Sequence, residues 1–343
     1  MHRGHAPKEG LFPPVKEGHF MKAIRISKTG DPSVMEITEV PKPAPRAGEA
    51  LVQLKTAGVN FIDIYIRKGL YQFGLPIILG MEGAGVVEEV GEGVREVKPG
   101  SRVAYAGHRG SYAEYNVVKA SQLIPLPKEV SFEDGAAFPL QGMTAHYLLH
   151  EYYRIKPGDS ILVHAAAGGV GLLLVQWAKH KGARVIGTVS TEEKAKIARD
   201  AGADDVILYT QQDFVAETKK LTGGKGADYI IDGVGQSTFT KDLEAVRAGG
   251  HICVFGSASG PAEPVAPNSL MGRSLTVSGG TLFNYISTRE ELLTRARSVL
   301  KGMREGWLKL RIDKVLPLEQ AAEAHRLLEG RQTTGKVVLK IGD

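Results

Sequence analysis

The sequence contains a single cysteine, Cys253, among its 343 residues. One thiol forms no disulfide framework within a chain and supplies no cysteine-rich zinc site. Because Cys253 lies in an apolar run, we interpret it as a buried bystander. The chain therefore depends on its hydrophobic core for stability rather than on disulfides or a structural metal.

Long apolar runs are also missing, since no stretch approaches the ~18 apolar residues of a membrane span. Residues 1–20 hold charges, prolines and histidines but no apolar core of a secretory signal. We expect these residues to form an N-terminal extension, with Met21 as an alternative start. No membrane contact is expected, and the expected location is the cytoplasm.

Neither sign of charge is in large excess, with 43 Lys and Arg against 38 Asp and Glu, a net charge of +5. Aromatics make up only 7%, and no basic block interleaves with them, so no nucleic-acid partner is expected. A mild positive balance could help attract an anionic cofactor. The apolar fraction of 43% is ordinary for a globular protein, and the length suits about two domains.

What the sequence does have is a glycine-rich turn between a strand and a helix, within Gly158–Lys179. Backbone N–H groups and the helix dipole make such a turn an anion site. Gly168 permits close backbone approach, Gly171 lets the helix pack on the strand, and Ala166 replaces the usual first glycine. A tight turn without a ligand is the alternative interpretation. The predicted dinucleotide-binding residues are Ala167, Gly168, Gly169, Val170 and Gly171.

The pattern of predicted strands and helices divides the chain into two parts. From Met21 to about Leu126, short strands and close-spaced turns indicate a partly closed β domain. From about residue 145, strands and helices alternate, which predicts an α/β, doubly wound parallel sheet. The predicted strands of this sheet are 161–164, 184–189, 205–208, 229–232, 251–255 and 275–278, with helices at 169–181, 191–201, 211–221 and 237–247. Helices at 288–305 and 321–328 and a strand at 336–341 are expected to rejoin the first domain.

The pattern of Gly158–Lys179 resembles the signature of quinone oxidoreductases, in the medium-chain dehydrogenase/reductase superfamily. The segments 57–63, 69–71, 138–144 and 232–235 match the same family, whose zinc-free branch includes the ζ-crystallins. The resemblance implies a Rossmann NADPH-binding domain, 145–284, inserted into a GroES-like, mostly β catalytic domain. That catalytic domain is expected over 21–144 and 285–343.

No metal is expected. Zinc-dependent relatives carry a cysteine where this chain has Asn60, and a Gly-His-Glu motif where it has Gly80-Met81-Glu82. A catalytic zinc needs about three protein ligands, and neither Asn60 nor Met81 supplies one of the usual kind. Without a Lewis acid, reduction of an already electrophilic acceptor is favoured over alcohol oxidation.

The second strand of the predicted sheet bears on the choice of nicotinamide cofactor. NAD-selective sites place a carboxylate about 20 residues after the glycine turn. Here Ser190 and Thr191 stand at that strand end, and Lys194 follows, which suits a 2′-phosphate. Lys194 alone could equally be a solvated helix residue. The resemblance assigns Lys194, Tyr209 and Arg331 to the 2′-phosphate, so NADPH is the predicted cofactor.

The predicted reaction is direct hydride transfer from nicotinamide C4 to a small-molecule quinone or enone. As candidate catalytic residues, Asn60 could donate an amide hydrogen bond near the nicotinamide or the acceptor carbonyl, while Tyr65 and Tyr71 could flank the acceptor. Asp63 matches the family motif, but a helix-capping carboxylate is an equally good interpretation. The further predicted cofactor-binding residues are Asn60 and Thr144, by resemblance beside the nicotinamide, and Gly233, Phe255, Gly256 and Ser257, at the ends of parallel strands.

Two alternative functions stay open. A 2-alkenal or enoyl reductase would share the fold, the cofactor and the absence of zinc. A non-enzymatic, RNA-binding or crystallin-like role is admitted by the resemblance alone. Family members usually pair through the edge strand of the cofactor domain, so a homodimer through 275–278 is expected.

Overall fold

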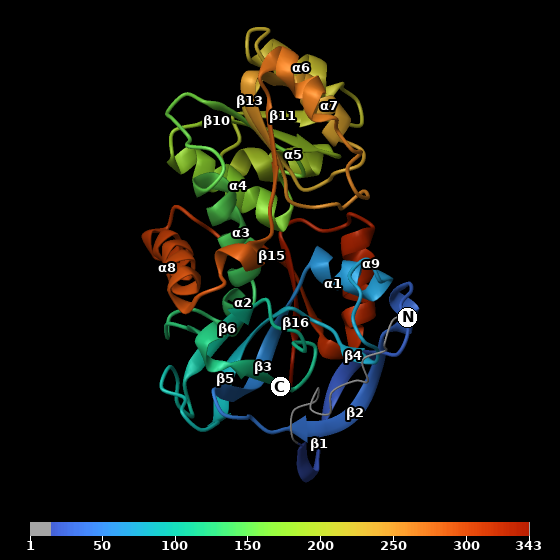
Figure 1. The fold of residues 1–343 in the computed structure, drawn as a ribbon, viewed down its shortest axis with the longest axis vertical. Coiled ribbons are helices and arrows are strands. Elements are labelled where there is room, and N and C mark those ends of the chain that lie inside the picture. Colours follow the sequence, from blue (N-terminus) through green and yellow to red (C-terminus); the bar gives the residue numbers. More distant parts are fainter. Residues whose placement is uncertain (1–14, 343) are drawn as a thin grey trace, which may run out of the picture. The chain divides into compact units, whose positions relative to one another are not determined.

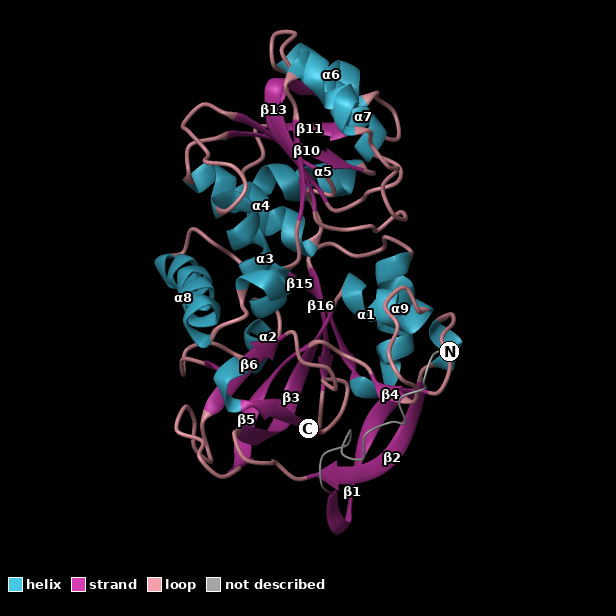
Figure 2. Ribbon diagram, in the orientation of Figure 1, coloured by secondary structure: helices cyan, strands magenta, loops and turns pink. Residues whose placement is uncertain are grey.

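The computed structural model describes residues 15–342, and the chain divides into two compact units (Figures 1 and 2). Unit 1 comprises Met1–Ala136, Leu316–Glu323 and Leu339–Asp343. Unit 2 comprises Ala137–Val315 and Ala324–Val338. Most of the predicted N-terminal extension lies outside the described residues.

Unit 1 consists mainly of strands. Its helices, α1 (Phe61–Lys68) and α2 (Phe132–Gly135), are short. Its strands are β1 (Val15–Ile26), β2 (Glu36–Pro43), β3 (Glu49–Val59), β4 (Ile77–Ile78), β5 (Glu82–Val90), β6 (Arg102–Ala106), β7 (Tyr115–Lys119) and β8 (Ile124–Pro125). One sheet has the order β2-β1-β4, and a larger one has the order β15-β16-β3-β5-β6-β8, with β7 also paired to β3. The strands β15 (Ile312–Pro317) and β16 (Lys336–Lys340) each cross a boundary between the units.

The larger sheet is covered on both faces at β3. Leu51 and Val52 are neighbours in this strand, and both are completely buried. Neighbouring side chains in a strand point to opposite faces, so apolar material lies on each side. The buried strand provides the support for the segment that follows it, which carries candidate residue Asn60.

Unit 2 contains the predicted doubly wound parallel sheet. Its strands are β9 (Ser160–Val163), β10 (Arg184–Val189), β11 (Asp205–Leu208), β12 (Ala227–Asp232), β13 (Val246–Val254) and β14 (Thr276–Gly279), in the order β11-β10-β9-β12-β13-β14. Its helices are α3 (Pro139–His150), α4 (Gly169–His180), α5 (Glu192–Asp200), α6 (Phe214–Leu221), α7 (Phe239–Ala245) and α8 (Arg289–Glu305), while α9 (Ala321–Glu329) crosses a boundary. The strand order reverses between β9 and β12, and ligands bind at the carboxyl ends of such a pair.

Helices cover both faces of this sheet (Figure 2). Phe214 of α6 and Phe239 of α7 belong to one buried cluster with Ile186 of β10. The next residue along β10 is Gly187, where an added Cβ would lie 4.0 Å from Cβ of Ala198 in α5. The strand therefore alternates between the two covered faces, as its nearly continuous apolar sequence requires.

Several element boundaries differ from the sequence predictions. Strand β1 begins at Val15, within the predicted extension. Strand β13 begins at Val246, inside a predicted helix, because Val246 pairs with Ala227 of β12. Residues 137–144, 285–315 and 324–338, which the sequence assigns to the first domain, lie in unit 2 by their contacts. Helix α3 is bonded to the unit 2 sheet, since Tyr229 OH of β12 donates to the Leu148 carbonyl at 2.9 Å, and α8 packs on α3, where a Cβ on Gly142 would meet Val299 at 2.7 Å.

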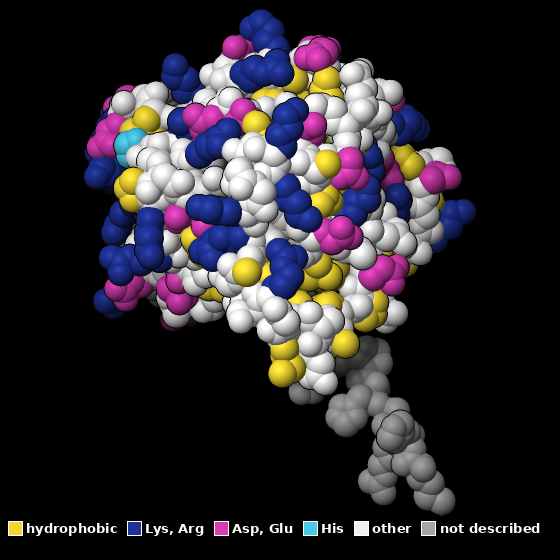
Figure 3. All heavy atoms as spheres, turned by 90° about the horizontal axis from the view of Figure 1, so that it is seen from above, with side chains coloured by type: hydrophobic (Ala, Val, Ile, Leu, Met, Phe, Trp, Pro, Cys, Tyr) yellow, Lys and Arg dark blue, Asp and Glu magenta, His cyan; other side chains and the backbone are white. Residues whose placement is uncertain are grey.

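Among the described residues, no helix is both long and apolar enough to cross a bilayer. On the face drawn in Figure 3, Lys and Arg side chains are scattered, with Asp and Glu among them. That face therefore shows no concentrated basic patch of the kind that binds a phosphate backbone.

Candidate functional site

The glycine-rich turn leaves β9 and enters α4 as the sequence predicts. Ala165 adopts a positive φ of 51°, and the backbone N–H of Gly168 donates to its carbonyl at 2.8 Å. Gly168 is the N-cap of α4, so no side chain caps the helix. Gly168, Gly169 and Val170 are half-buried, while Ala167 is buried. Uncapped N–H groups at an accessible helix start are what an anion site requires.

Glycine is needed at Gly171 because the helix lies directly on the turn. An added Cβ there would come within 2.2 Å of the carbonyl oxygen of Ala165 and 2.9 Å of Ala166 Cα. Gly168 is less constrained, since its nearest neighbour would be 3.2 Å away. The packing role predicted for Gly171 is thus confirmed. The role predicted for Gly168, to let a ligand come close to the backbone, stays a prediction.

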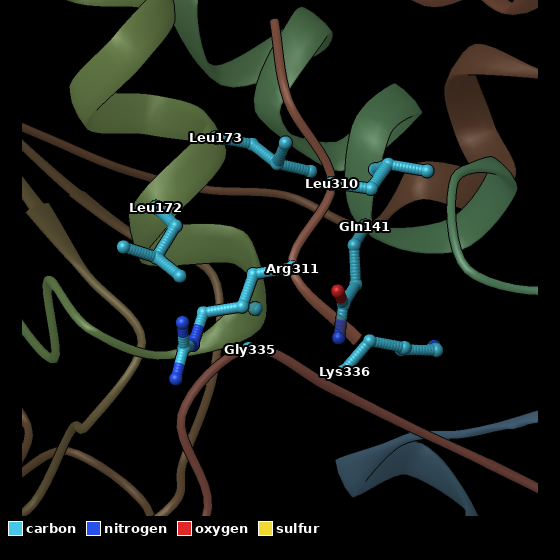
Figure 4. Close-up of a pocket in the computed structure, with 8 residues that line it drawn as sticks. Gln141, Leu172, Leu173, Leu310, Arg311, Gly335 and Lys336 are labelled. Carbon is cyan, nitrogen blue, oxygen red and sulfur yellow. The ribbon is translucent and has the colours of Figure 1, made fainter. Parts of the chain in front are cut away.

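A small pocket opens beside the first turn of α4 (Figure 4). Figure 4 shows the Gln141 amide pointing into it from α3, and the guanidinium of Arg311 directed away from Gln141. A Cβ on Gly169 would lie 2.2 Å from Gln141 Oε1, so only glycine allows this approach. On the other side, the backbone N–H of Gly335 donates to Ala167 at 3.1 Å. Gln141 of α3 and the backbone of Gly335 therefore contact the turn from outside it.

The residues predicted to hold a 2′-phosphate come together at the end of β10. Lys194 Nζ donates to the carbonyl of Arg331 at 2.6 Å, and the backbone N–H of Tyr209 donates to Val189 at 3.1 Å. Burial, followed by the positive charge of Arg331, lowers the pKa of Lys194. Arg331 and Tyr209 are exposed and Ser190 is half-buried, so the group is accessible. Two converging cations without a carboxylate between them suit a dianion.

The acidic residues at the start of α5 follow the strand end rather than occupy it, although the charge of Glu193 partly offsets the lowering of the Lys194 pKa. Thr191 caps the helix, accepting a hydrogen bond from the backbone N–H of Lys194 at 3.3 Å. Glu192 and Glu193 are exposed, as predicted, and Glu192 forms an ion pair with Arg199 at 3.8 Å. The residues present at the end of β10 therefore fit NADPH better than NADH.

Beyond the reversal of the strand order, four further candidate residues lie at the ends of β12 and β13. A Cβ on Gly233 would lie 2.7 Å from Phe255 Cζ, and one on Gly256 would lie 2.7 Å from the carbonyl of Gly233. Gly233, Phe255, Gly256 and Ser257 are all half-buried. These four residues are thus neighbours, and the close backbone approach explains why two of them are glycine.

Thr144 lies inside α3, where its side chain is 6% exposed. It belongs to unit 2, as do the residues of the turn and of the 2′-phosphate group. Asn60, Tyr65 and Tyr71 belong to unit 1.

The Asn60 side chain is hydrogen-bonded to other residues of unit 1. Its Nδ2 donates to Glu82 Oε2 at 2.9 Å and to the carbonyl of Gly58 at 3.3 Å, and the residue is 4% exposed. These bonds use both amide hydrogens. Donation to the nicotinamide or the acceptor carbonyl would require Asn60 to leave one of these acceptors, and this role stays a prediction.

Asp63 caps the helix that carries Tyr65. Its Oδ2 accepts from the backbone N–H of Asn60 at 2.9 Å, which completes a capping box at the start of α1. Tyr112 OH donates to the same oxygen at 3.0 Å. Burial, then the nearby Asp63 charge, raises the pKa of Tyr112 well above its usual value. The capping interpretation of Asp63 is confirmed.

The two candidate tyrosines lie together. Helix α1 ends at Gly69, whose φ of 82° turns the chain back. The rings of Tyr65 and Tyr71 are consequently 6.2 Å apart and tilted by 49°. Tyr71 is 52% exposed, so its ring and hydroxyl are accessible to a small molecule.

No group of three or more His, Cys, Asp or Glu side chains suited to a metal ion occurs among the described residues. The bond between Asn60 and Glu82 joins two of the positions that carry metal-site residues in zinc-dependent relatives. The third, Met81, is buried at 6% exposure. The chemistry of this donor set, an amide, a thioether and one carboxylate, does not match a catalytic zinc site.

Sequence reasoning missed three contributors to the site. Glu82 binds Asn60, Gln141 contacts the helix start at Gly169, and Gly335 binds the turn through its backbone. Each lies far along the chain from its partner, so no local pattern identifies the contact. The available signals for these contacts were the residue types themselves: a glycine at 335, and the polar residues Glu82 and Gln141 within mostly apolar segments.

Two family models match the chain. Residues 46–128 match the alcohol dehydrogenase GroES-like domain, and residues 169–298 match the zinc-binding dehydrogenase model. The first match lies within unit 1 and the second within unit 2.

Curated proteins and solved structures resemble nearly the whole chain. A 2-haloacrylate reductase of Burkholderia sp is 41% identical over 326 residues, covering 92% of this chain and 98% of the relative. Quinone oxidoreductase 1 of Escherichia coli (strain K12) is 41% identical over 321 residues, covering 92% and 98%. The crystal structure of Escherichia coli quinone oxidoreductase complexed with NADPH has a TM-score of 0.90 at 41% identity, covering 93% and 99%.

Proposed function

This chain belongs to the quinone oxidoreductase family, and we propose that it transfers a hydride from NADPH to a quinone or related electrophilic acceptor. It is an oxidoreductase with a GroES-like domain and a Rossmann-type domain. The observation that carries the choice of cofactor is the convergence of Lys194 and Arg331 where NAD-selective sites hold a carboxylate.

Bound NADPH supplies the hydride, from C4 of its nicotinamide ring. The backbone N–H groups of Gly169 and Val170, at the uncapped start of α4, bind the pyrophosphate. Lys194 and Arg331 neutralise the 2′-phosphate. Gly233 and the segment Phe255–Ser257, half-buried at the ends of parallel strands, would line the nicotinamide half.

The acceptor is flanked by the rings of Tyr65 and Tyr71, which offer flat surfaces with a hydroxyl at the tip. Holding acceptor and cofactor in contact accounts for much of the rate acceleration. Asn60 fixes the backbone that leads into α1 and keeps Glu82 bonded. The proton that completes the reduction comes from water or from the accessible Tyr71 hydroxyl.

A second acceptor class is an electron-poor alkene. The relative that is a 2-haloacrylate reductase is as similar to this chain as the quinone oxidoreductases are, at 41% identity. Hydride addition to an activated double bond uses the same cofactor geometry as hydride addition to a quinone. The acceptor range of this enzyme therefore includes conjugated alkenes.

We also propose a homodimer formed through β14. This strand is the edge of the unit 2 sheet, and its residues are exposed or half-buried. An open edge presents unpaired backbone groups that a second copy can pair with. Size-exclusion chromatography with light scattering tests this, and a monomer at all concentrations would remove the proposal.

The cellular location and the roles of the two domains are proposed from sequence features. We place the enzyme in the cytoplasm, since a chain with a single cysteine suits that compartment. Residues 21–144 and 285–343 would form the catalytic domain, and residues 145–284 the cofactor domain. The two family-model matches support the central parts of this division, while the second match extends to 298 and unit 2 includes 137–144, 285–315 and 324–338, which argues against its outer limits.

The test is an acceptor screen that follows NADPH absorbance, with 1,4-benzoquinone and crotonyl-CoA as acceptors and a chelator control. Turnover of benzoquinone that is insensitive to chelator, with NADPH preferred over NADH, supports the proposal. No NADPH oxidation with any acceptor, together with tight RNA binding, would support the non-enzymatic alternative instead.

A further inference from the structure

An arginine near the candidate tyrosines has an unusual environment. The guanidinium carbon of Arg109 lies 4.2 Å from the centre of the Phe73 ring. Both residues belong to unit 1 and both are exposed, Phe73 by 40%. Among the described residues, no carboxylate lies within 4.0 Å of this guanidinium, and its N–H groups have no hydrogen-bond acceptor.

Stacking leaves the guanidinium ready to bind an anion. A ring occupies one face of the group, while the N–H donors point outward in its plane. Those in-plane donors match the two oxygens of a carboxylate. Desolvation lowers the pKa of Arg109, but a guanidinium stays protonated at neutral pH, so the positive charge is kept.

The backbone that carries Arg109 is held in place. Asn116 Nδ2 donates to the Arg109 carbonyl at 2.8 Å. Gly110 follows with a φ of 101°, where a Cβ would come within 2.7 Å of Asn116 Oδ1. The backbone N–H of Gly110 donates to Gly80 at 2.9 Å. A fixed backbone reduces the entropy lost when the side chain binds a ligand.

The same contacts tie Arg109 to the candidate acceptor residues. Gly80 lies two positions before Glu82, which binds Asn60. Phe73 lies two positions after Tyr71, whose ring contacts Tyr65. The loop that carries Arg109 is therefore bonded to Gly80, close along the chain to Glu82, and its guanidinium contacts Phe73, close along the chain to Tyr71.

We propose that Arg109 binds the carboxylate of an α,β-unsaturated acid, so that small acidic alkenes are substrates. This inference rests on the proposed function, because the hydride comes from NADPH. The hydride adds to the β-carbon, a proton from water adds to the α-carbon, the C=C bond becomes a single bond, and NADPH becomes NADP⁺. Arg109 also offsets the negative charge that moves onto the carboxylate during hydride addition, when an acid anion is otherwise a poor electrophile.

The experiment compares 2-chloroacrylate with its methyl ester, which differ in charge but carry the same double bond. The measured quantity is the ratio of kcat/KM for the acid to kcat/KM for the ester. In Arg109→Met this ratio should fall about tenfold to a hundredfold, the loss typical of a charge-assisted hydrogen bond. Arg109→Lys should recover part of it, because the charge remains while the planar fork is lost.

Arg95→Met is the matched control, since Arg95 is an exposed cation of the same unit. It removes one positive charge and should leave the ratio unchanged. A ratio in Arg109→Met equal to that of the wild type overturns the assignment of Arg109. Wild-type turnover of benzoquinone without any turnover of 2-chloroacrylate overturns the substrate class but leaves the quinone reductase proposal standing. Absence of turnover with both acceptors removes the proposed function itself.

Discussion

His164 Nε2 lies 2.7 Å from Asp242 Oδ1, and both side chains are buried. The other ring nitrogen of His164 lies 2.9 Å from Thr188 Oγ1. Burial raises the pKa of Asp242 to about 7 despite the opposing effect of His164. Burial alone would lower the pKa of His164, but the charge and hydrogen bond of Asp242 together with the charge of Asp232 outweigh it, and the pKa is raised.

This pair connects the two turns that line the proposed cofactor crevice. His164 directly precedes the glycine-rich turn, while Asp232, which also contributes to the raised pKa of Asp242, ends β12. Asp232 Oδ1 accepts from the backbone N–H groups of Val234 at 2.6 Å and Gly235 at 3.1 Å. The buried polar network therefore fixes backbone on both sides of the strand reversal.

Removing one member of the buried pair should cost more than removing both. Asp242→Leu should lower the free energy of unfolding by about 3–5 kcal/mol, since it leaves His164 without its partner. The double variant with His164→Leu should lose less than Asp242→Leu alone. Urea unfolding of the three proteins measures this, and strictly additive losses would contradict it.

Lys194 and Arg331 should control the preference for NADPH. Lys194→Ala and Arg331→Ala should each raise KM for NADPH about tenfold or more, with little change in KM for NADH, because only NADPH carries the 2′-phosphate. Lys196→Ala is the control, since its side chain is 76% exposed on the same helix and pairs with Asp200. Equal effects on the two cofactors would place the 2′-phosphate elsewhere.

Gly171→Ala should impair both stability and cofactor binding. The added Cβ would stand 2.2 Å from the carbonyl of Ala165, so α4 must move away from the turn. The expected loss in unfolding free energy is about 1–3 kcal/mol, as for overpacked cores. Gly272→Ala is the control, because nothing lies within 4 Å of its Cβ position. NADPH fluorescence titration together with urea unfolding checks the result, and wild-type affinity in Gly171→Ala would contradict it.

His146 should make stability depend on pH. Burial, then the charges of His150, Arg295 and Lys181, lowers the pKa of His146 to about 3. Its ring stacks on His150 at 4.2 Å, contacts the edge of Trp177 at 5.4 Å, and its Nδ1 lies 3.2 Å from Arg295 Nη1. The folded state therefore disfavours the protonated ring.

Below a pH of about 6.5 the unfolded chain binds a proton that the folded chain rejects, so stability is complete above this pH and declines as the pH falls. The contribution of His146 should change by up to about 1.4 kcal/mol per pH unit within this window. Urea unfolding at pH 7, 6 and 5 measures it. The stability difference between wild type and His146→Phe should shrink as pH falls, and a constant difference would exclude His146 as the source.

Local patterns identified the elements that carry the cofactor site. The bounds of β10 and β11 match the predicted ones, and α4 begins at Gly169 as predicted. These bounds could be predicted because glycine-rich turns and apolar runs are local signals, which neighbouring residues in the sequence carry. The assignment of Val246 to a helix failed because pairing with β12 outweighs helix propensity there.

Side-chain partners could not be predicted in the same way. The sequence identified Asn60 as a candidate, but not that Glu82 and Gly58 occupy its amide hydrogens. The sequence also gave no indication that Arg109 contacts Phe73, because the two residues lie on separate loops that meet only in the folded chain. Such contacts depend on long-range geometry, which no spacing along the chain encodes.

The sequence by itself determined the class of this protein: a glycine turn, an absent carboxylate after β10 and two lost zinc ligands are properties of residue type and local order. The tertiary structure decided which charges meet. It brought Lys194 to Arg331, buried His164 against Asp242, and left Arg109 stacked but without an anion among the described residues. The physical reason is that electrostatic and hydrogen-bond energies depend on distance and burial, which only the packed chain sets.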